Sequence, residues 1–201
     1  MTTDQHRRTL ATMFNLPNQL TFLRLILSVI LFGFISVEWY LTSMVLFIVA
    51  ASTDWLDGYF ARKYGQITTL GRILDPFADK VIVCGTFIFL GAIPVMLKTP
   101  FGLRVWMVVV IVGRELLVTA LRGFIEQRGS DFSAKMSGKL KMVLQCVAAG
   151  VCLFYLSYTD PLVNAPDWCR WLLVGSVWSA VLLTIYSGVV YVAVAVKLLR
   201  E

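Results

Sequence analysis

The sequence contains few residues that bind transition metals or form disulfides. Its 201 residues include a single histidine, His6, and only four cysteines, Cys84, Cys146, Cys152 and Cys169. One histidine excludes a metal site built on several histidines. Because no two cysteines form a C-x-x-C pair, we interpret them as small apolar residues rather than as ligands or a disulfide framework.

Charge is also scarce. Charged residues make up 15% of the chain and hydrophobic residues 58%, and the mean hydropathy is +0.78. Several apolar runs reach the roughly 20 residues that span a bilayer core, and none alternates as barrel strands do. We therefore predict an all-α membrane protein, a six-transmembrane-helix bundle that forms a single domain over residues 1–201. The predicted spans are 20–37, 39–61, 76–97, 103–126, 138–158 and 170–196.

The first 17 residues precede these spans as a juxtamembrane segment. They have no apolar core of the kind that a signal peptide requires. Leu10, Met13 and Phe14 are spaced at i, i+3 and i+4, which predicts a short N-terminal interfacial helix on the membrane surface. A frayed cytosolic tail is the alternative.

The basic residues indicate the orientation. An even number of spans places both termini on one side, and 15 of the 18 Lys and Arg residues then fall on that side. Only Lys98, Arg104 and Arg170 fall on the other. By the positive-inside rule, we predict that both termini face the cytosol. We expect the protein in the inner membrane of a bacterium. Topology and attraction to anionic membrane lipids account for the net charge of +6, so no nucleic-acid partner is expected.

Four aspartates stand out in the stretch "DWLDGYFARKYGQITTLGRILDPFADK", residues 54–80. Asp54 and Asp57 are three residues apart, and Asp75 and Asp79 are four apart, so each pair lies on one helical face. We expect residues 58–74 to form a turn that brings the two pairs together at one cytosolic mouth. Four carboxylates without His or Cys favour Mg²⁺ or Mn²⁺. The alternative is that the aspartates pair with neighbouring cations at a wet interface.

The residues between the aspartates suggest a phosphate ligand. Gly58, Ala61 and Gly71 are small where a ligand would approach the backbone closely. Arg62 and Arg72 would neutralise phosphate charge. Two metal ions together with arginines form a site suited to a pyrophosphate under nucleophilic attack.

This segment resembles the signature D-x2-D-G-x2-A-R-x8-G-x3-D-x3-D of the CDP-alcohol phosphotransferases, with all eight fixed positions matched. The resemblance implies a six-helix homodimer that uses CDP-diacylglycerol. It implies that two divalent metals are held by Asp54, Asp57, Asp75 and Asp79, with Asp79 also the general base. It further implies that the CDP pocket is lined by Gly58, Ala61, Arg62 and Gly71.

Later segments bear on the acceptor alcohol. Arg114, Arg122 and Lys139, with Lys141, would form a second anion pocket suited to a phosphorylated acceptor if they faced the aspartates. Lipid phosphates are the alternative partners, above all for Lys141. The segments "GRELLVTALRGF", "SGKLKMVLQ" and "NLPNQLTFLRL" resemble those of phosphatidylglycerophosphate synthases, which implies sn-glycerol 3-phosphate as the acceptor.

The last of these segments begins the first span. The resemblance implies that Asn18 and Thr21 approach the nucleotide, although Asn18 could instead cap the helix that follows Pro17. Arg24, one turn further on, could serve either the site or the membrane interface.

Three alternatives stay open. The first is the same chemistry with inositol phosphate, serine or phosphatidylglycerol as the acceptor. The second is a divalent-cation transporter, although transporters usually carry their carboxylates near the bilayer midplane. The third is a helical scaffold without catalysis.

Overall fold

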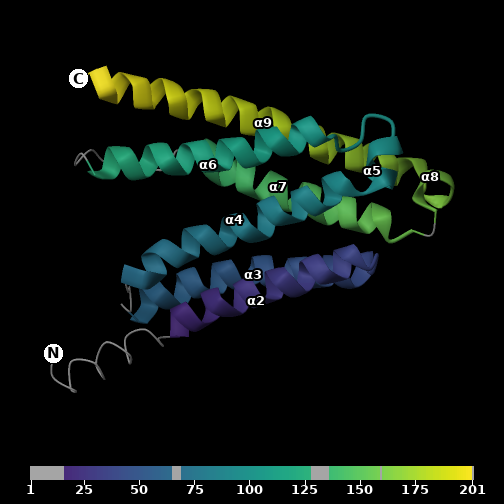
Figure 1. The fold of residues 1–201 in the computed structure, drawn as a ribbon, viewed down its shortest axis with the longest axis horizontal. Helices are drawn as coiled ribbons and strands as arrows, with labels where there is room; N and C mark the ends of the chain where they lie inside the picture. Colours follow the sequence, from purple (N-terminus) through teal and green to yellow (C-terminus); the bar gives the residue numbers. More distant parts are fainter. Residues whose placement is uncertain (1–15, 65–68, 128–135, 159, 201) are drawn as a thin grey trace. The chain divides into compact units, whose positions relative to one another are not determined.

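The computed structural model describes residues 16–64, 69–127, 136–158 and 160–200. Throughout these residues the regular elements are helices, which confirms the all-α prediction (Figure 1). They are α2 (Leu16–Ser36), α3 (Tyr40–Tyr64), α4 (Thr69–Ala92), α5 (Pro94–Lys98), α6 (Val105–Gln127), α7 (Met136–Leu156), α8 (Pro161–Asn164) and α9 (Asp167–Arg200). Two stretches, Gln19–Ser36 of α2 and Asp167–Lys197 of α9, are long and apolar enough to cross a membrane.

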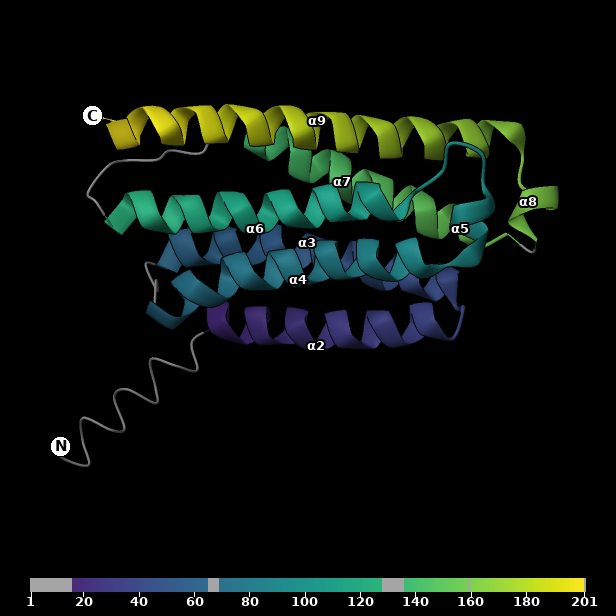
Figure 2. The same ribbon diagram turned by 45° about the horizontal axis from the view of Figure 1, so that its top comes forward.

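The chain divides into two compact units, residues 1–86 and 87–201, with the division inside α4. In the first unit, α2 and α3 pack side by side as a helical hairpin (Figure 2). Its connection turns at Glu38, which has a φ of 63°, and Trp39 stacks on Phe34 with ring centroids 5.4 Å apart. Three residues between the helices suffice because this left-handed residue reverses the chain.

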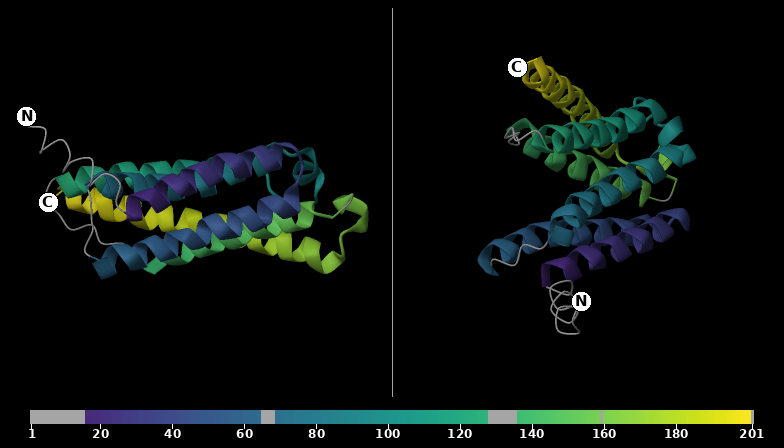
Figure 3. Two further views of the ribbon diagram at one scale, coloured as in Figure 1. Left: turned by 90° about the horizontal axis from the view of Figure 1, so that it is seen from below. Right: turned by 60° about the vertical axis from the view of Figure 1, so that its left-hand side comes forward.

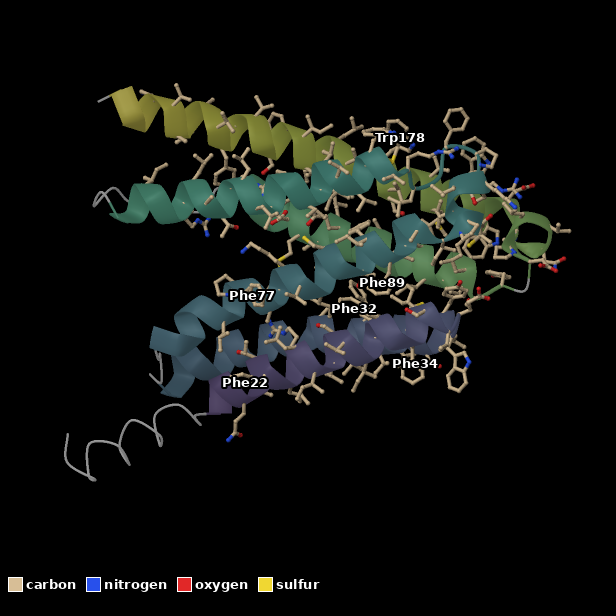
Figure 4. All side chains as sticks on the ribbon, viewed as in Figure 1. Phe22, Phe32, Phe34, Phe77, Phe89 and Trp178 are labelled. Atoms are coloured by element: carbon tan, nitrogen blue, oxygen red, sulfur yellow. The ribbon has the colours of Figure 1, made fainter. Side chains whose placement is uncertain are left out.

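The part of α4 that belongs to the first unit packs on α2 at a glycine. A Cβ on Gly85 would lie 2.2 Å from the ring of Phe32, so no larger residue fits there without moving the ring (Figure 4). This close approach fixes the register between α2 and α4. The register in turn determines which charged residues of the two helices, such as Arg24 and Asp79, lie opposite each other.

In the second unit, α9 packs against both α7 and α6 (Figure 3). At one end, the indole Nε1 of Trp178 donates a hydrogen bond to the carbonyl oxygen of Phe101 at 3.0 Å, and Trp106 packs edge-on against the same indole. Further along, the apolar cluster of Val118, Ile125, Tyr191 and Ala195 joins α6 to α9. The long helix α9 is therefore the surface on which α6 and α7 are held.

Two of the sequence-based expectations for α4 are wrong. The segment 58–74 is not a turn, because α3 continues to Tyr64 and α4 already begins at Thr69. Pro76 lies inside α4 rather than at its start, which is tolerated since a proline removes only one intrahelical donor.

The predicted span 76–97 is also not one helix. α4 ends at Ala92, Ile93 is extended (φ −76°, ψ 123°), and Pro94 starts the short helix α5. A residue that precedes proline avoids the helical region, which explains the break. The other five predicted spans coincide with α2, α3, α6, α7 and α9 to within a few residues at each end. The expected interfacial helix with Leu10, Met13 and Phe14 lies outside the described residues.

Candidate active site

The signature residues lie on two consecutive helices. Asp54, Asp57, Gly58, Ala61 and Arg62 belong to the last part of α3, and Gly71, Asp75 and Asp79 belong to the first part of α4. Both aspartate pairs are therefore helical, as their spacing predicted. Several expected site side chains lie outside the described part of the structure: Asn18, Asp54, Asp57, Ala61, Arg62, Asp75 and Lys139. Asp79 is the signature aspartate whose side chain is described.

Asp79 is paired with an arginine of α2. The guanidinium of Arg24 is fully buried, and its Nη1 donates a hydrogen bond to Oδ1 of Asp79, 55 positions away in the chain. Its Nε lies 3.5 Å from the hydroxyl of Thr53 on α3. Because a buried guanidinium requires an opposite charge, the interface alternative for Arg24 is wrong. Arg24 binds residues of α3 and α4 in the interior of the first unit.

One guanidinium thus touches the two helices that carry the signature. Thr53 directly precedes Asp54, and Asp79 is the last aspartate of the motif. Arg24 therefore holds the beginning of the first motif half next to the end of the second. Thr21, three residues before Arg24 on α2, is also fully buried, so it lies on the same side of that helix.

Asn18 is the third residue of α2, which begins at Leu16. The residue that caps a helix precedes its first turn, whereas Leu16 and Pro17, both helical, precede Asn18. The capping alternative for Asn18 does not agree with these bounds.

The donors of this region fit a hard divalent cation. Within the described side chains, no group of three or more His, Cys, Asp or Glu gathers, and Asp79 is described with Arg24 at its Oδ1. The helical motif supplies four carboxylates and no soft ligand, and Arg24 joins its two halves. Oxygen-only donor sets of this kind suit Mg²⁺ and Mn²⁺.

The second unit contains a buried polar network on α6, centred on Arg114. This residue is only 8% exposed. Its Nη2 donates to the hydroxyl of Ser187 on α9 at 2.5 Å, and its Nη1 lies 3.3 Å from Oε1 of Glu115. The ring of Tyr191, one turn beyond Ser187, lies 5.2 Å from the Arg114 Cζ, a cation–π contact. Both terminal nitrogens of Arg114 are therefore held.

The same carboxylate engages α7. Lys141 forms an ion pair with Oε1 of Glu115 and is itself buried. Gln145, one turn further along α7, has its Nε2 at 3.5 Å from that oxygen and at 3.0 Å from the hydroxyl of Thr184 on α9. The network centred on Arg114 and Glu115 thus joins α6 and α7 directly, and Gln145 connects it to α9.

Three guanidinium nitrogens in this unit have no hydrogen-bond partner within the described part of the chain: Nε of Arg114, Nε of Arg122 and, near the start of α9, Nε of Arg170. Buried polar groups are nearly always hydrogen-bonded, so an orphan donor suggests a missing acceptor. Arg122 is half-buried and lies eight residues beyond Arg114, or about 12 Å along the helix. Arg114, Lys141, Arg122 and Glu115 together carry a net charge of +2 (three cations, one carboxylate).

These contacts bear on the sequence-based predictions in different ways. The structure brings Arg114 and Lys141 together at Glu115, with both side chains buried. That these cations and Lys139 face the aspartates stays a prediction.

Sequence reasoning missed the residues that hold the cations in place. Glu115 is absent from the residues predicted for the site. Thr184, Ser187, Gly188 and Tyr191 recur at i, i+3, i+4 and i+7 in the otherwise apolar α9, a periodicity that marks one helix face. Reading small and hydroxylated residues by this period would have located the face that receives Arg114.

The chain matches known proteins over most of its length. Residues 14–186 match the family described as CDP-alcohol phosphatidyltransferase. The chain therefore belongs to the CDP-alcohol phosphatidyltransferase family and is an enzyme of that class.

Its relatives include several bacterial proteins named CDP-diacylglycerol–glycerol-3-phosphate 3-phosphatidyltransferase. The protein of Bacillus subtilis (strain 168) is 35% identical over 193 residues, which covers 88% of this chain and 92% of the relative. That of Escherichia coli (strain K12) is 34% identical over 166 residues, covering 72% and 87%. That of Shigella flexneri serotype 5b is 32% identical over 190 residues, covering 90% and 95%.

Proposed function

We propose that this enzyme transfers the phosphatidyl group of CDP-diacylglycerol to sn-glycerol 3-phosphate, with phosphatidylglycerophosphate and CMP as products. The names of its relatives support both substrates. Within the molecule, the observation that carries the choice of acceptor is the set of cations on α6 and α7, in which Arg114 and Arg122 each have an orphan Nε.

The charge of that cluster matches a phosphorylated acceptor. A net charge of +2 on Arg114, Lys141, Arg122 and Glu115 is balanced by the dianion of a phosphate monoester. Serine has no net charge, and phosphatidylglycerol carries a single one, so neither would balance it. Inositol phosphate would balance the charge equally well, and the assay must separate it from glycerol 3-phosphate. Lys139, predicted for the same pocket, would add one further positive charge and leave a small positive excess around the bound dianion.

The signature would bind the other substrate. Asp54, Asp57, Asp75 and Asp79 would hold two divalent ions, Mg²⁺ or Mn²⁺. When bound, these ions would neutralise the pyrophosphate and stabilise the charge that develops on the departing CMP. Gly58, Ala61, Arg62 and Gly71, with Asn18 and Thr21 of α2, would surround the CDP moiety.

Asp79 would act as the general base. Its carboxylate accepts the proton of the free primary hydroxyl of glycerol 3-phosphate while that oxygen attacks the lipid-linked phosphorus. The bond between this phosphorus and the CMP oxygen breaks, and CMP leaves with the electron pair. Arg24 would hold the carboxylate in position, since its Nη1 binds Oδ1 of Asp79.

The proposal includes a membrane topology. Six spans formed by α2, α3, α4 with α5, α6, α7 and α9 would cross a bacterial inner membrane as a homodimer among membrane lipids, with termini and active site cytosolic. A cysteine introduced for Val163, which is 81% exposed on α8, is expected to react with an impermeant maleimide added to intact cells from outside. A cysteine for Lys197 is expected to react only after permeabilisation. The reverse pattern would contradict the orientation.

The activity is tested with purified protein, CDP-diacylglycerol and labelled glycerol 3-phosphate. With Mg²⁺ or Mn²⁺ we expect a labelled lipid and an equal amount of CMP, and with EDTA neither. Labelled inositol phosphate, serine and phosphatidylglycerol serve as competing acceptors, and preferential use of any of them would overturn the assignment. Metal flux into proteoliposomes without CMP formation would indicate a transporter instead.

A further inference from the structure

A short face of α9 surrounds Arg114. Ser187 accepts a hydrogen bond from its Nη2 at 2.5 Å, and the ring of Tyr191 lies 5.2 Å from its Cζ. Between them, a Cβ on Gly188 would lie 3.2 Å from Cγ of Arg114, which is tighter than ordinary van der Waals contact. The Ser187 hydroxyl thus binds the guanidinium of Arg114, the missing side chain of Gly188 leaves room for its aliphatic part, and the Tyr191 ring lies against the face of the guanidinium.

The remaining contacts restrict Arg114 further. Its Nη1 lies 3.3 Å from Oε1 of Glu115, so its two terminal nitrogens are both engaged while Nε has no partner among the described residues. Because Nη1, Nη2 and one face of the guanidinium are all in contact with other residues, the Nε–H of Arg114 cannot turn to another direction. The orphan N–H therefore has a defined direction before any ligand arrives.

We infer that Ser187, Gly188 and Tyr191 are positioning residues that orient Arg114 for the phosphate of the acceptor and so set the affinity for phosphorylated acceptors. This inference rests on the proposed function. A planar guanidinium loses less conformational entropy on binding a phosphate when its orientation is fixed in advance. The α9 face would thus act on acceptor binding rather than on the nucleotide or the chemical step.

A purely structural role makes a different prediction. Tyr191 also belongs to the apolar cluster with Val118, Ile125 and Ala195, so its replacement could simply loosen the contact between α6 and α9. General loosening would lower stability and kcat and would raise the KM of both substrates. A positioning role changes the KM of the acceptor alone.

The first test uses two small substitutions, Ser187→Ala and Gly188→Ala. Ser187→Ala removes the acceptor for Nη2, and Gly188→Ala pushes on the stem of Arg114. Ser187→Ala is expected to raise the KM for glycerol 3-phosphate by roughly tenfold to a hundredfold, the range for a lost hydrogen bond to a charged group. Gly188→Ala is expected to raise the same KM by at least several fold, because it displaces Arg114. The kcat and the KM for CDP-diacylglycerol are expected to stay within about twofold of wild type, a change of less than about 0.5 kcal/mol.

Gly175→Ala is the matched control for Gly188→Ala. Both glycines lie in α9, but a Cβ at Gly175 meets nothing within 4 Å. The extra methyl group there should leave both KM values unchanged. If Gly175→Ala raised the acceptor KM as much as Gly188→Ala, the effect would come from the helix as a whole, and the inference would be wrong.

A second pair of variants isolates the ring of Tyr191. Tyr191→Phe keeps an aromatic face over Arg114 and is expected to raise the acceptor KM less than Tyr191→Leu, which removes the ring. Thermal unfolding in detergent accompanies each variant. Unchanged acceptor KM in Ser187→Ala, Gly188→Ala and Tyr191→Leu would overturn the inference while leaving the proposed function intact. Absence of any product from wild-type enzyme and glycerol 3-phosphate would instead overturn the proposed function, and the inference with it.

Discussion

Replacing Asp79 with asparagine is expected to lower kcat by about three orders of magnitude or more while the protein still inserts into the membrane. The substitution keeps the size of the side chain and an oxygen that can accept a hydrogen bond from Arg24. It removes the negative charge and the basicity. A general base contributes roughly 10²- to 10⁴-fold to a rate, and loss of a metal ligand adds to this. CMP release under saturating substrates measures the effect.

Asp167→Asn is the control for the Asp79 variant. Asp167 lies in the first turn of α9 with its side chain 87% exposed, so its neutralisation should change kcat by less than about twofold. Mn²⁺ titration of the Asp79→Asn protein, followed by electron paramagnetic resonance, gives a readout independent of turnover, and weaker Mn²⁺ binding is expected. Asp79→Asn protein with near-normal turnover would remove Asp79 from the reaction and leave the mechanism above without a base.

Arg24→Met is expected to destabilise the protein by roughly 3 kcal/mol, because it leaves Asp79 without the guanidinium that balances its charge in the helical unit. Activity should also fall at least tenfold, since the carboxylate loses the contact that orients it. The stability and activity of Arg24→Lys should lie between those of wild type and Arg24→Met. An ammonium keeps the charge but cannot reach Thr53 and Asp79 with separate nitrogens. Unfolding in mixed micelles measures the stability of each variant.

A double-mutant cycle separates the pair from its surroundings. Arg24→Met combined with Asp79→Asn should be less destabilising than the sum of the single changes, by roughly 1 to 3 kcal/mol, because a neutral asparagine needs no counter-charge. Arg170→Met is the comparison for an exposed pair: Arg170 lies 3.6 Å from Asp167 with its side chain 33% exposed, and its loss should cost less than about 1 kcal/mol. Strict additivity in the Arg24–Asp79 cycle would show that the two residues do not depend on each other.

The positions of the helices were largely predictable from the sequence, but the points where they begin, end or break were not. Apolar runs in the sequence locate α2, α3, α6, α7 and α9, since a long apolar run predicts a helix whose side chains avoid water. The sequence predicted the wrong structure at two prolines: Pro76 was placed at a helix start and lies inside α4, and Pro94 was placed inside a helix and follows a break. A proline near a predicted helix start is compatible with a position inside the helix, as at Pro76, and a proline within an apolar run is compatible with a break, as at Pro94. Only the surrounding packing decides between these outcomes.

The candidate site divides in a similar way. The aspartate signature is local in sequence, and its helical spacing was readable without a structure. The partners of its charged residues are not local: Arg24 meets Asp79 across 55 positions, and Arg114 meets Ser187 across 73. No periodicity within one helix encodes such a contact, because it depends on how separate helices dock. Glu115 illustrates the consequence, since its role as the shared counter-charge of Arg114 and Lys141 appears only when α6 and α7 are together.

The long separation between Arg24 and Asp79 has a consequence for biogenesis. Ribosomes add about 5 to 20 residues per second, so the 55 positions between them correspond to about 3 to 11 seconds of synthesis. During this interval, the first apolar helix carries an arginine whose carboxylate has not yet been made. Near the end of that helix, the long side chain can reach the lipid headgroups and be stabilised there. Under the proposed topology, we expect the nascent chain to exchange a lipid phosphate for Asp79 once α4 has been made, so the contact between Arg24 and Asp79 can form only then.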